Sequence, residues 1–112
     1  MIEAKEGEGV EPGAFSCSED GRTWHFRGRL TFDDAARVLR SVEDLPLPKG
    51  GHVDFSGLQA ADSSALAVIL ALRRRASEAH HHRLVFEGLP PGLLALAHVY
   101  GVDELLGLSP AA

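Results

Sequence analysis

Val53-Asp54-Phe55-Ser56-Gly57, followed after four residues by Asp62-Ser63-Ser64-Ala65-Leu66, is the stretch that decides the fold of this chain. Residues 52–55 predict a short buried strand that leads into a turn. From Asp62 onward the apolar residues adopt helical spacing, and the helix is predicted to end at about Glu78. The residues that share its first apolar face are Leu66, Ile69 and Leu70.

The neighbouring segments extend this pair into an α/β pattern. Downstream, the apolar run 84–86 predicts a second buried strand, so that strand, helix and strand form a βαβ unit, which is normally parallel and right-handed. Upstream, residues 14–18 and 23–29 predict two strands joined by a turn that contains Asp20-Gly21. The sequence therefore predicts a mixed sheet.

Two further helices are predicted from apolar stripes with the spacing i, i+3, i+4 and i+7. Thr31 and Asp34 resemble a capping box at the start of the first. Its stripe consists of Ala35, Val38, Leu39 and Val42. Pro90-Pro91 opens the second, Gly101 ends it, and Asp103 is placed to cap a last short turn with Leu105 and Leu106. The stripe of this helix consists of Leu93, Leu96, Ala97 and Tyr100.

The resulting order is ββαβαβα, which predicts an α/β fold with a mixed four-stranded β-sheet and helices packed against it. The chain has 112 residues, close to the usual size of one domain. We expect a polar, flexible N-terminal segment over residues 1–13, one domain over residues 14–108, and a tail over residues 109–112.

Charge and composition exclude several classes of partner. The net charge is −5, and the first eleven residues carry −3 of it, so the folded part has no basic surface for nucleic acid or anionic lipid. No apolar run approaches the roughly 20 residues of a membrane span, which argues against direct membrane insertion. The single Cys17 suits a reducing compartment, and no secretory signal begins the sequence, so we expect a cytoplasmic protein.

Enzymatic and metal-binding functions are disfavoured. The sequence has no nucleophile elbow, phosphate-binding loop or dinucleotide fingerprint, so we expect neither catalysis nor a cofactor. His80-His81-His82 predicts a solvated loop, because consecutive imidazoles point in different directions and no suitable carboxylate or cysteine spacing accompanies them. Arg73-Arg74-Arg75 predicts a solvent-exposed helix face.

Ser63 is the most informative polar residue, because it lies in the first turn of a helix that follows a buried strand. The first amides of a helix lack intrahelical partners, so a phosphate on Ser63 or an acceptor on a partner could bind there. Asp62 is the predicted cap and would repel a phosphate. A serine that serves only local hydrogen bonding remains the alternative.

The helix that follows Ser63 is apolar on all sides. Residues 65–72 contain no polar side chain, and Val68 and Leu72 point nearly opposite to the face centred on Leu66, Ile69 and Leu70. A sheet covers only one side of a helix. Either the flanking helices cover the remaining sides, or part of the surface is an apolar patch for a partner.

The segment from Val53 to Leu66 resembles the signature of STAS domains, over roughly residues 14–107. This family includes anti-sigma-factor antagonists and the MlaB-like STAS subunit of the Gram-negative lipid-asymmetry ABC transporter. Leu89-Pro90 and residues 96–106 are similar to the transporter branch in particular. Ala65 in place of the antagonists' common glycine, and residues 28–31 in place of their Gly-Glu-Leu-Asp, favour the same branch.

The resemblance implies a non-enzymatic module for protein–protein interaction in lipid transport. Its partner is the ATPase of a phospholipid-transport ABC complex, at the inner face of the inner membrane. The implied partner-binding residues are Asp62, Ser63, Ser64, Ala65, Ala67 and Val68. The antagonist branch implies instead an anti-sigma-factor kinase as partner and phosphorylation of Ser63. A STAS module of some other assembly is the third possibility.

Overall fold

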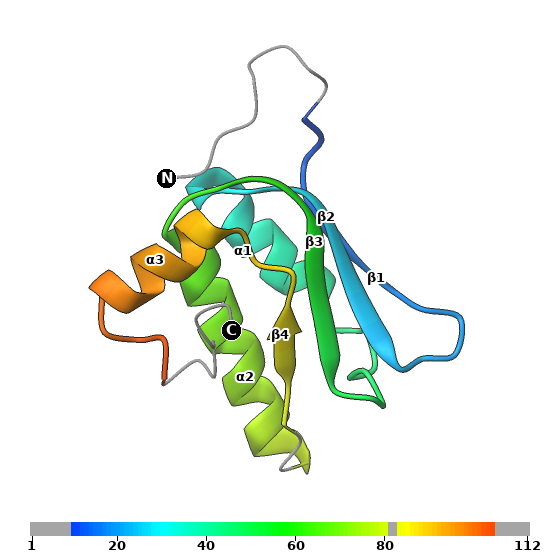
Figure 1. The fold of residues 1–112 in the computed structure, drawn as a ribbon. Helices are drawn as coiled ribbons and strands as arrows, with labels where there is room; N and C mark the ends of the chain where they lie inside the picture. The colour runs from blue at the N-terminus through cyan, green and yellow to red at the C-terminus, as the bar shows by residue number, and fades with distance from the viewer. Residues whose placement is uncertain (1–9, 81–82, 105–112) are drawn as a thin grey trace.

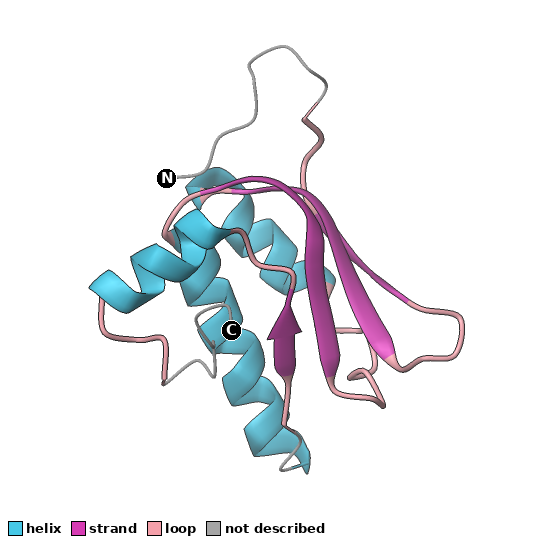
Figure 2. Ribbon diagram, in the orientation of Figure 1, coloured by secondary structure: helices cyan, strands magenta, loops and turns pink. Residues whose placement is uncertain are grey.

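The computed structural model describes residues 10–80 and 83–104, which form one sheet and three helices (Figure 1). The strands are β1 (Ala14–Cys17), β2 (Thr23–Leu30), β3 (His52–Ala61) and β4 (Val85–Glu87). The helices are α1 (Phe32–Ser41), α2 (Ser64–His80) and α3 (Pro91–Val99). Figure 2 shows the helices together on one side of the sheet, so the domain has two layers. The predicted order ββαβαβα and the mixed α/β sheet are confirmed.

The sheet has the strand order β1-β2-β3-β4. β1 and β2 pair antiparallel, whereas β3 pairs parallel with both β2 and β4. The turn from β1 to β2 closes where the Gly21 N–H donates to the Ser18 carbonyl at 2.9 Å, and Gly21 has φ +72°. This left-handed conformation is one that glycine adopts without steric cost. The parallel pairs include the βαβ unit that the sequence predicted.

β3 is much longer than predicted, because it continues from Phe55 to Ala61 instead of turning at Ser56-Gly57. Its second half pairs with β2 through two register irregularities, ending with Leu30 opposite Ala61. Gly57 lies inside the strand, where a Cβ atom would come within 2.6 Å of the Phe26 carbonyl oxygen. The glycine therefore permits close strand approach and does not form the expected turn.

Aromatic side chains from neighbouring strands form the centre of the core. Phe26 and Phe55 are each 1% exposed, and their ring centroids lie 5.6 Å apart. Trp24 is fully buried, and its indole N–H donates to the Pro46 carbonyl at 3.0 Å. Since a buried indole N–H needs a partner, this bond fixes the loop after α1 against the sheet.

The flanking helices cover most of the apolar surface of α2. The residues of α2 that are buried in the core are Ala65, Leu66, Val68, Ile69, Leu72 and Ala76. Ala67 is exposed, while Leu70 and Ala71 are half-buried. Most of residues 65–72 are therefore buried, and the exposed apolar surface of this segment is limited to parts of these three residues. None of the helices in residues 10–80 and 83–104 is long and apolar enough to cross a membrane.

Two predictions about side-chain burial were wrong, one for Arg75 and one for Tyr100. Arg75 does not lie on a solvated face: its guanidinium donates to the carbonyls of Val42 and Leu45 at 2.7 Å each and lies 5.7 Å from the Trp24 ring centroid. It thereby satisfies carbonyls beyond the C-terminal end of α1, as basic side chains often do. Tyr100 is 56% exposed, because it follows the last turn of α3 and lies beyond the core.

The ends of the domain are only partly described. Of the segment 1–13, which was predicted to be flexible, the structure describes residues from Val10 onward. Within it, the Glu11 carbonyl accepts a hydrogen bond of 2.9 Å from the Arg29 N–H. The predicted tail, and the last turn with Leu105 and Leu106, lie outside the described residues. Asp103 accepts a hydrogen bond of 3.0 Å from His98.

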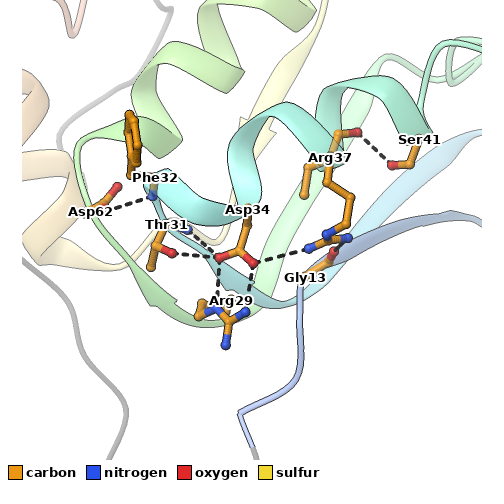
Figure 3. Close-up of polar contacts among 9 residues, drawn as sticks. Gly13, Arg29, Thr31, Phe32, Asp34, Arg37, Ser41 and Asp62 are labelled. Atoms are coloured by element: carbon orange, nitrogen blue, oxygen red, sulfur yellow. Dashed lines mark hydrogen bonds and ion pairs between the residues drawn. The ribbon is translucent and has the colours of Figure 1, made fainter.

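A buried carboxylate fixes the start of α1. Asp34 is 2% exposed, and Arg29 donates to its two oxygens from Nε and Nη2 at 2.9 Å each (Figure 3). The Thr31 backbone N–H and hydroxyl also donate to Asp34, at 3.0 and 2.7 Å, so the predicted capping box is confirmed. Arg37 adds a weaker contact at 3.3 Å. The hydrogen bonds from Arg29 hold the pKa of Asp34 well below its ordinary value and outweigh the opposing effect of burial.

Replacing Asp34 by asparagine is expected to lower the free energy of unfolding by about 3 kcal/mol at pH 7, because Arg29 loses its anionic partner. Urea unfolding of the full chain measures this change. Asp33→Asn is the matched control, since Asp33 is exposed in the same helical turn and its loss should cost less than about 1 kcal/mol. Equal losses in the two variants would contradict the role of Asp34.

Wild type and Asp34→Asn also test how the contribution of Asp34 to stability changes with pH. Because the pKa of Asp34 is lowered by folding, its contribution is present above the ordinary value of 3.8 and is lost as the pH falls below it. The stability difference between wild type and Asp34→Asn should therefore stay constant from pH 7 to about 5 and narrow below that. A difference that widens on acidification would be inconsistent with this assignment.

Candidate functional site

The candidate site is the short link between β3 and α2, where Asp62 and Ser63 lie. Asp62 uses both oxygens of its carboxylate. Oδ1 accepts from the Ser64 backbone N–H at 2.8 Å, and Oδ2 accepts from the Phe32 backbone N–H at 3.0 Å (Figure 3). The predicted cap of α2 is present, and the same carboxylate also binds the first residue of α1. One side chain therefore joins the N-terminal ends of two helices.

The environment of Asp62 favours its ionised form. Burial raises the pKa of this carboxyl group, but the backbone N–H groups of Phe32 and Ser64 lower it by more, so the pKa lies below its ordinary value of 3.8. Negative charge is also stabilised where helix N-termini converge. The link is consequently anionic at neutral pH.

The first amides of α2 already have partners. The Ser64 N–H binds the Asp62 carboxylate, the Ala65 N–H binds the Asp62 carbonyl at 3.1 Å, and the Leu66 N–H binds the Ser63 carbonyl at 3.1 Å. These three amides are therefore not free to hold a phosphate or a partner's acceptor, and no partner is seen for the Ser63 N–H among the residues that the structure describes. Within the described part of the chain the Ser63 hydroxyl makes no hydrogen bond, and Ser63 is exposed. This hydroxyl is the polar group that the turn offers to another molecule.

The structure divides the six residues of the predicted site between surface and core. Ala65 and Val68 are both 0% exposed, so neither side chain can contact a partner without unfolding of the helix. Ser63 and Ala67 are exposed, four residues apart and hence on one face of α2. We call Ser63 and Ala67, with the capping Asp62, the α2 corner. The predicted contact set is correspondingly smaller than the sequence suggested.

A shallow hollow continues from the α2 corner along the same helix. It has a volume of about 260 Å³ and is lined by Ala71, Arg74, Arg75 and Glu78. Since Ala71 lies four residues after Ala67, the exposed side of α2 runs from small residues at its start to paired charges near its end. This side has the shape of a contact surface rather than of an enclosed small-molecule site.

Phe32 adjoins the α2 corner through its bond to Asp62, and it was not predicted as a site residue. It is 79% exposed, although its backbone is bound to Asp62. Its spacing to Ala35 and Leu39, i+3 and i+7, would extend the apolar stripe of α1 and predict burial. The only available signal was its place directly after the capping Thr31, where a helix can project past the core.

The open face of the sheet carries the other polar groups, and their arrangement is not that of a Ser–His–Asp triad. His25 Nδ1 lies 3.1 Å from Asp54 Oδ2, and the Ser56 hydroxyl donates to the same oxygen at 3.0 Å. Serine thus bonds to the carboxylate and not to a histidine base, unlike a nucleophilic triad. His52 pairs with Glu87 beside them. Residues 10–80 and 83–104 hold no cluster of three or more metal-ligating side chains.

Substituting alanine for Asp62 is expected to lower the free energy of unfolding by about 1–3 kcal/mol, because two helix starts lose their acceptor at once. The Asp62→Asn variant retains one good capping oxygen, so its loss of stability should be smaller. Ser63→Ala serves as control and should change stability by less than about 0.5 kcal/mol. Thermal unfolding monitored by circular dichroism ranks the three variants; an Asp62→Ala protein as stable as Ser63→Ala would refute the double cap.

Comparison with known proteins identifies the family of the chain. A family model described as "Mlab, STAS domain" matches residues 18–107, from the turn after β1 to beyond α3. No curated protein matches the chain closely enough to count as a relative. The family match includes the whole α2 corner and Phe32, and it extends over most of the chain. The chain therefore belongs to the STAS domain family, in its MlaB-like form.

Proposed function

We propose that this domain is a non-enzymatic interaction module that docks through the α2 corner onto the ATPase subunit of a phospholipid-transport ABC complex. Docking would support the assembly and the activity of that complex. The partner class follows from the MlaB-like family, and the surface follows from the geometry of α2. Such a partner would hold the domain at the cytoplasmic face of the inner membrane.

The observation that carries the proposal is the exposed hydroxyl of Ser63 on a turn that Asp62 holds rigid. A rigid turn loses little conformational entropy when a partner binds it. Ser63 and Ala67 are small and uncharged, so a partner's backbone can approach closely without removing water from a charge. The hydroxyl can both donate and accept a hydrogen bond in the contact.

The surroundings of Ser63 support a docking role over catalysis. Among residues 10–80 and 83–104, no imidazole or other base forms a hydrogen bond with the Ser63 hydroxyl, which an activated nucleophile would need. The nearest acidic group along the chain, Asp62, has both oxygens occupied by backbone amides. Ser63 is therefore proposed to act through contact.

Introducing a charge at Ser63 tests the proposal. Ser63→Arg and Ser63→Glu are each expected to raise the Kd for the ATPase subunit at least about tenfold, because the new charge must be desolvated in the contact. The measurement is titration calorimetry of the full chain against the purified ATPase subunit of the phospholipid transporter from the same organism. Thermal unfolding establishes that each variant is folded.

Ser16→Arg provides a matched control. Ser16 is an exposed residue of β1 that pairs with His25 on the open face of the sheet, away from the helices. The same charge placed there should leave the affinity unchanged. Absence of binding by the wild-type chain would rule out the proposed partner. Unchanged affinity in both Ser63 variants would rule out the proposed surface.

The exposure of Ser63 also favours a second function, that of an anti-sigma-factor antagonist whose partner kinase phosphorylates this residue. A phosphate would add about −2 charges at pH 7, next to the ionised Asp62. Mass spectrometry of the protein isolated from its native cells distinguishes the two functions. We expect unmodified Ser63 for the transporter subunit, whereas a substantial phosphorylated fraction would favour the antagonist.

A further inference from the structure

Phe32, the first residue of α1, has a large and exposed apolar side chain. Phe32 is 79% exposed, more than the other large apolar side chains on the described surface, Val85, Val99 and Tyr100. Val99 and Tyr100 lie at the far end of α3, whereas the backbone of Phe32 is hydrogen-bonded to Asp62, the residue directly before Ser63. The backbone of Phe32 is therefore joined through Asp62 to the turn that carries Ser63.

The backbone on both sides of the Phe32 ring is held in place. Its N–H is bound by Asp62, and the preceding Thr31 is bound by the buried Asp34, which Arg29 holds in place. Figure 3 shows the ring turned away from the Asp34 cluster. A phenylalanine has only two side-chain torsions, so a ring on such a backbone loses little freedom when a partner covers it.

The charge beside the ring indicates the chemistry of the surface that would cover it. Asp33 is exposed and makes no hydrogen bond within the described part of the chain. The basic side chains of the same region, Arg29 and Arg37, both contact Asp34 and remain partly exposed, and Arg29 also interacts with the charge of Asp33. The three carboxylates around Phe32, those of Asp33, Asp34 and Asp62, outnumber these two guanidiniums, so the local net charge is negative and a complementary surface would carry a basic side chain.

We propose that Phe32 is the apolar anchor of the docking surface: its ring enters an apolar pocket of the ATPase subunit, and a lysine or arginine at the rim of that pocket faces Asp33. This inference rests on the proposed function and adds the chemistry of the partner's surface. Aromatic side chains are enriched at the centres of protein interfaces, where they contribute a large share of the affinity. Ser63 and Ala67 then form the closely packed border of the contact.

The test measures the affinity of the full chain for the purified ATPase subunit by titration calorimetry. Phe32→Ala and Phe32→Gln are each expected to raise the Kd about 30-fold, as loss of an anchoring aromatic does. Phe32→Leu keeps an apolar side chain and should retain affinity within about tenfold. Val99→Ala is the matched control, because Val99 is 76% exposed on α3 and its removal should leave the Kd unchanged.

The predicted ion pair of Asp33 is tested by measuring the affinity of wild type and Asp33→Asn over a range of salt concentrations. Wild-type affinity should fall as salt is added, and the variant should show a weaker salt dependence, because a screened ion pair has been removed. Phe32 is exposed, so its variants should unfold at nearly the wild-type temperature, which separates a lost contact from a lost fold.

The outcomes separate this inference from the proposed function. If Ser63→Arg weakens binding while both Phe32→Ala and Phe32→Gln bind as tightly as the wild type, the anchor is refuted and the docking surface stands. If the wild-type chain does not bind the ATPase subunit at all, both proposals fall together. If Asp33→Asn retains the full salt dependence, the basic rim is wrong.

Discussion

The carboxylate of Asp62 joins the first turns of α1 and α2, and the arrangement of the candidate site depends on this interaction. Two helix N-termini have unpaired amides that need acceptors, and both ends carry partial positive charge. One ionised side chain meets both requirements. As a result, the backbones at Phe32 and at the Ser63 turn are held together, although they are about thirty residues apart in the chain.

The start of α2 is buried on one side and exposed on the other. Ala65 and Val68 are buried in the core, whereas Ser63 and Ala67, within about one helical turn of them, are exposed. Small residues make this possible, since an exposed alanine presents little apolar area and permits close approach. Substitutions on the outer side can therefore change binding without changing stability, and substitutions on the inner side act through the fold.

The start of α1 concentrates acidic groups, and most of them have structural roles. Asp34 is neutralised by Arg29 and caps the helix, and Asp62 is occupied by backbone amides. Burial, and also the charge of Asp34, raise the pKa of Asp62, but the hydrogen bonds from the Phe32 and Ser64 amides together lower it by more. Among these three residues, Asp33 is the one that is exposed and makes no hydrogen bond. The corner consequently offers an apolar ring, a hydroxyl and one exposed negative charge.

The order of the elements, the caps of α1 and α2, and the family could be predicted, because periodicity, capping and the motif at Asp62 are local patterns of a few residues. The extension of β3 to Ala61 could not, since that half of the strand exists through pairing with β2. The same holds for the bonds of Arg75 to carbonyls beyond α1 and for the exposure of Phe32. Hydrogen bonds and burial between distant segments depend on how the helices and strands pack, and no local spacing of residues encodes that packing.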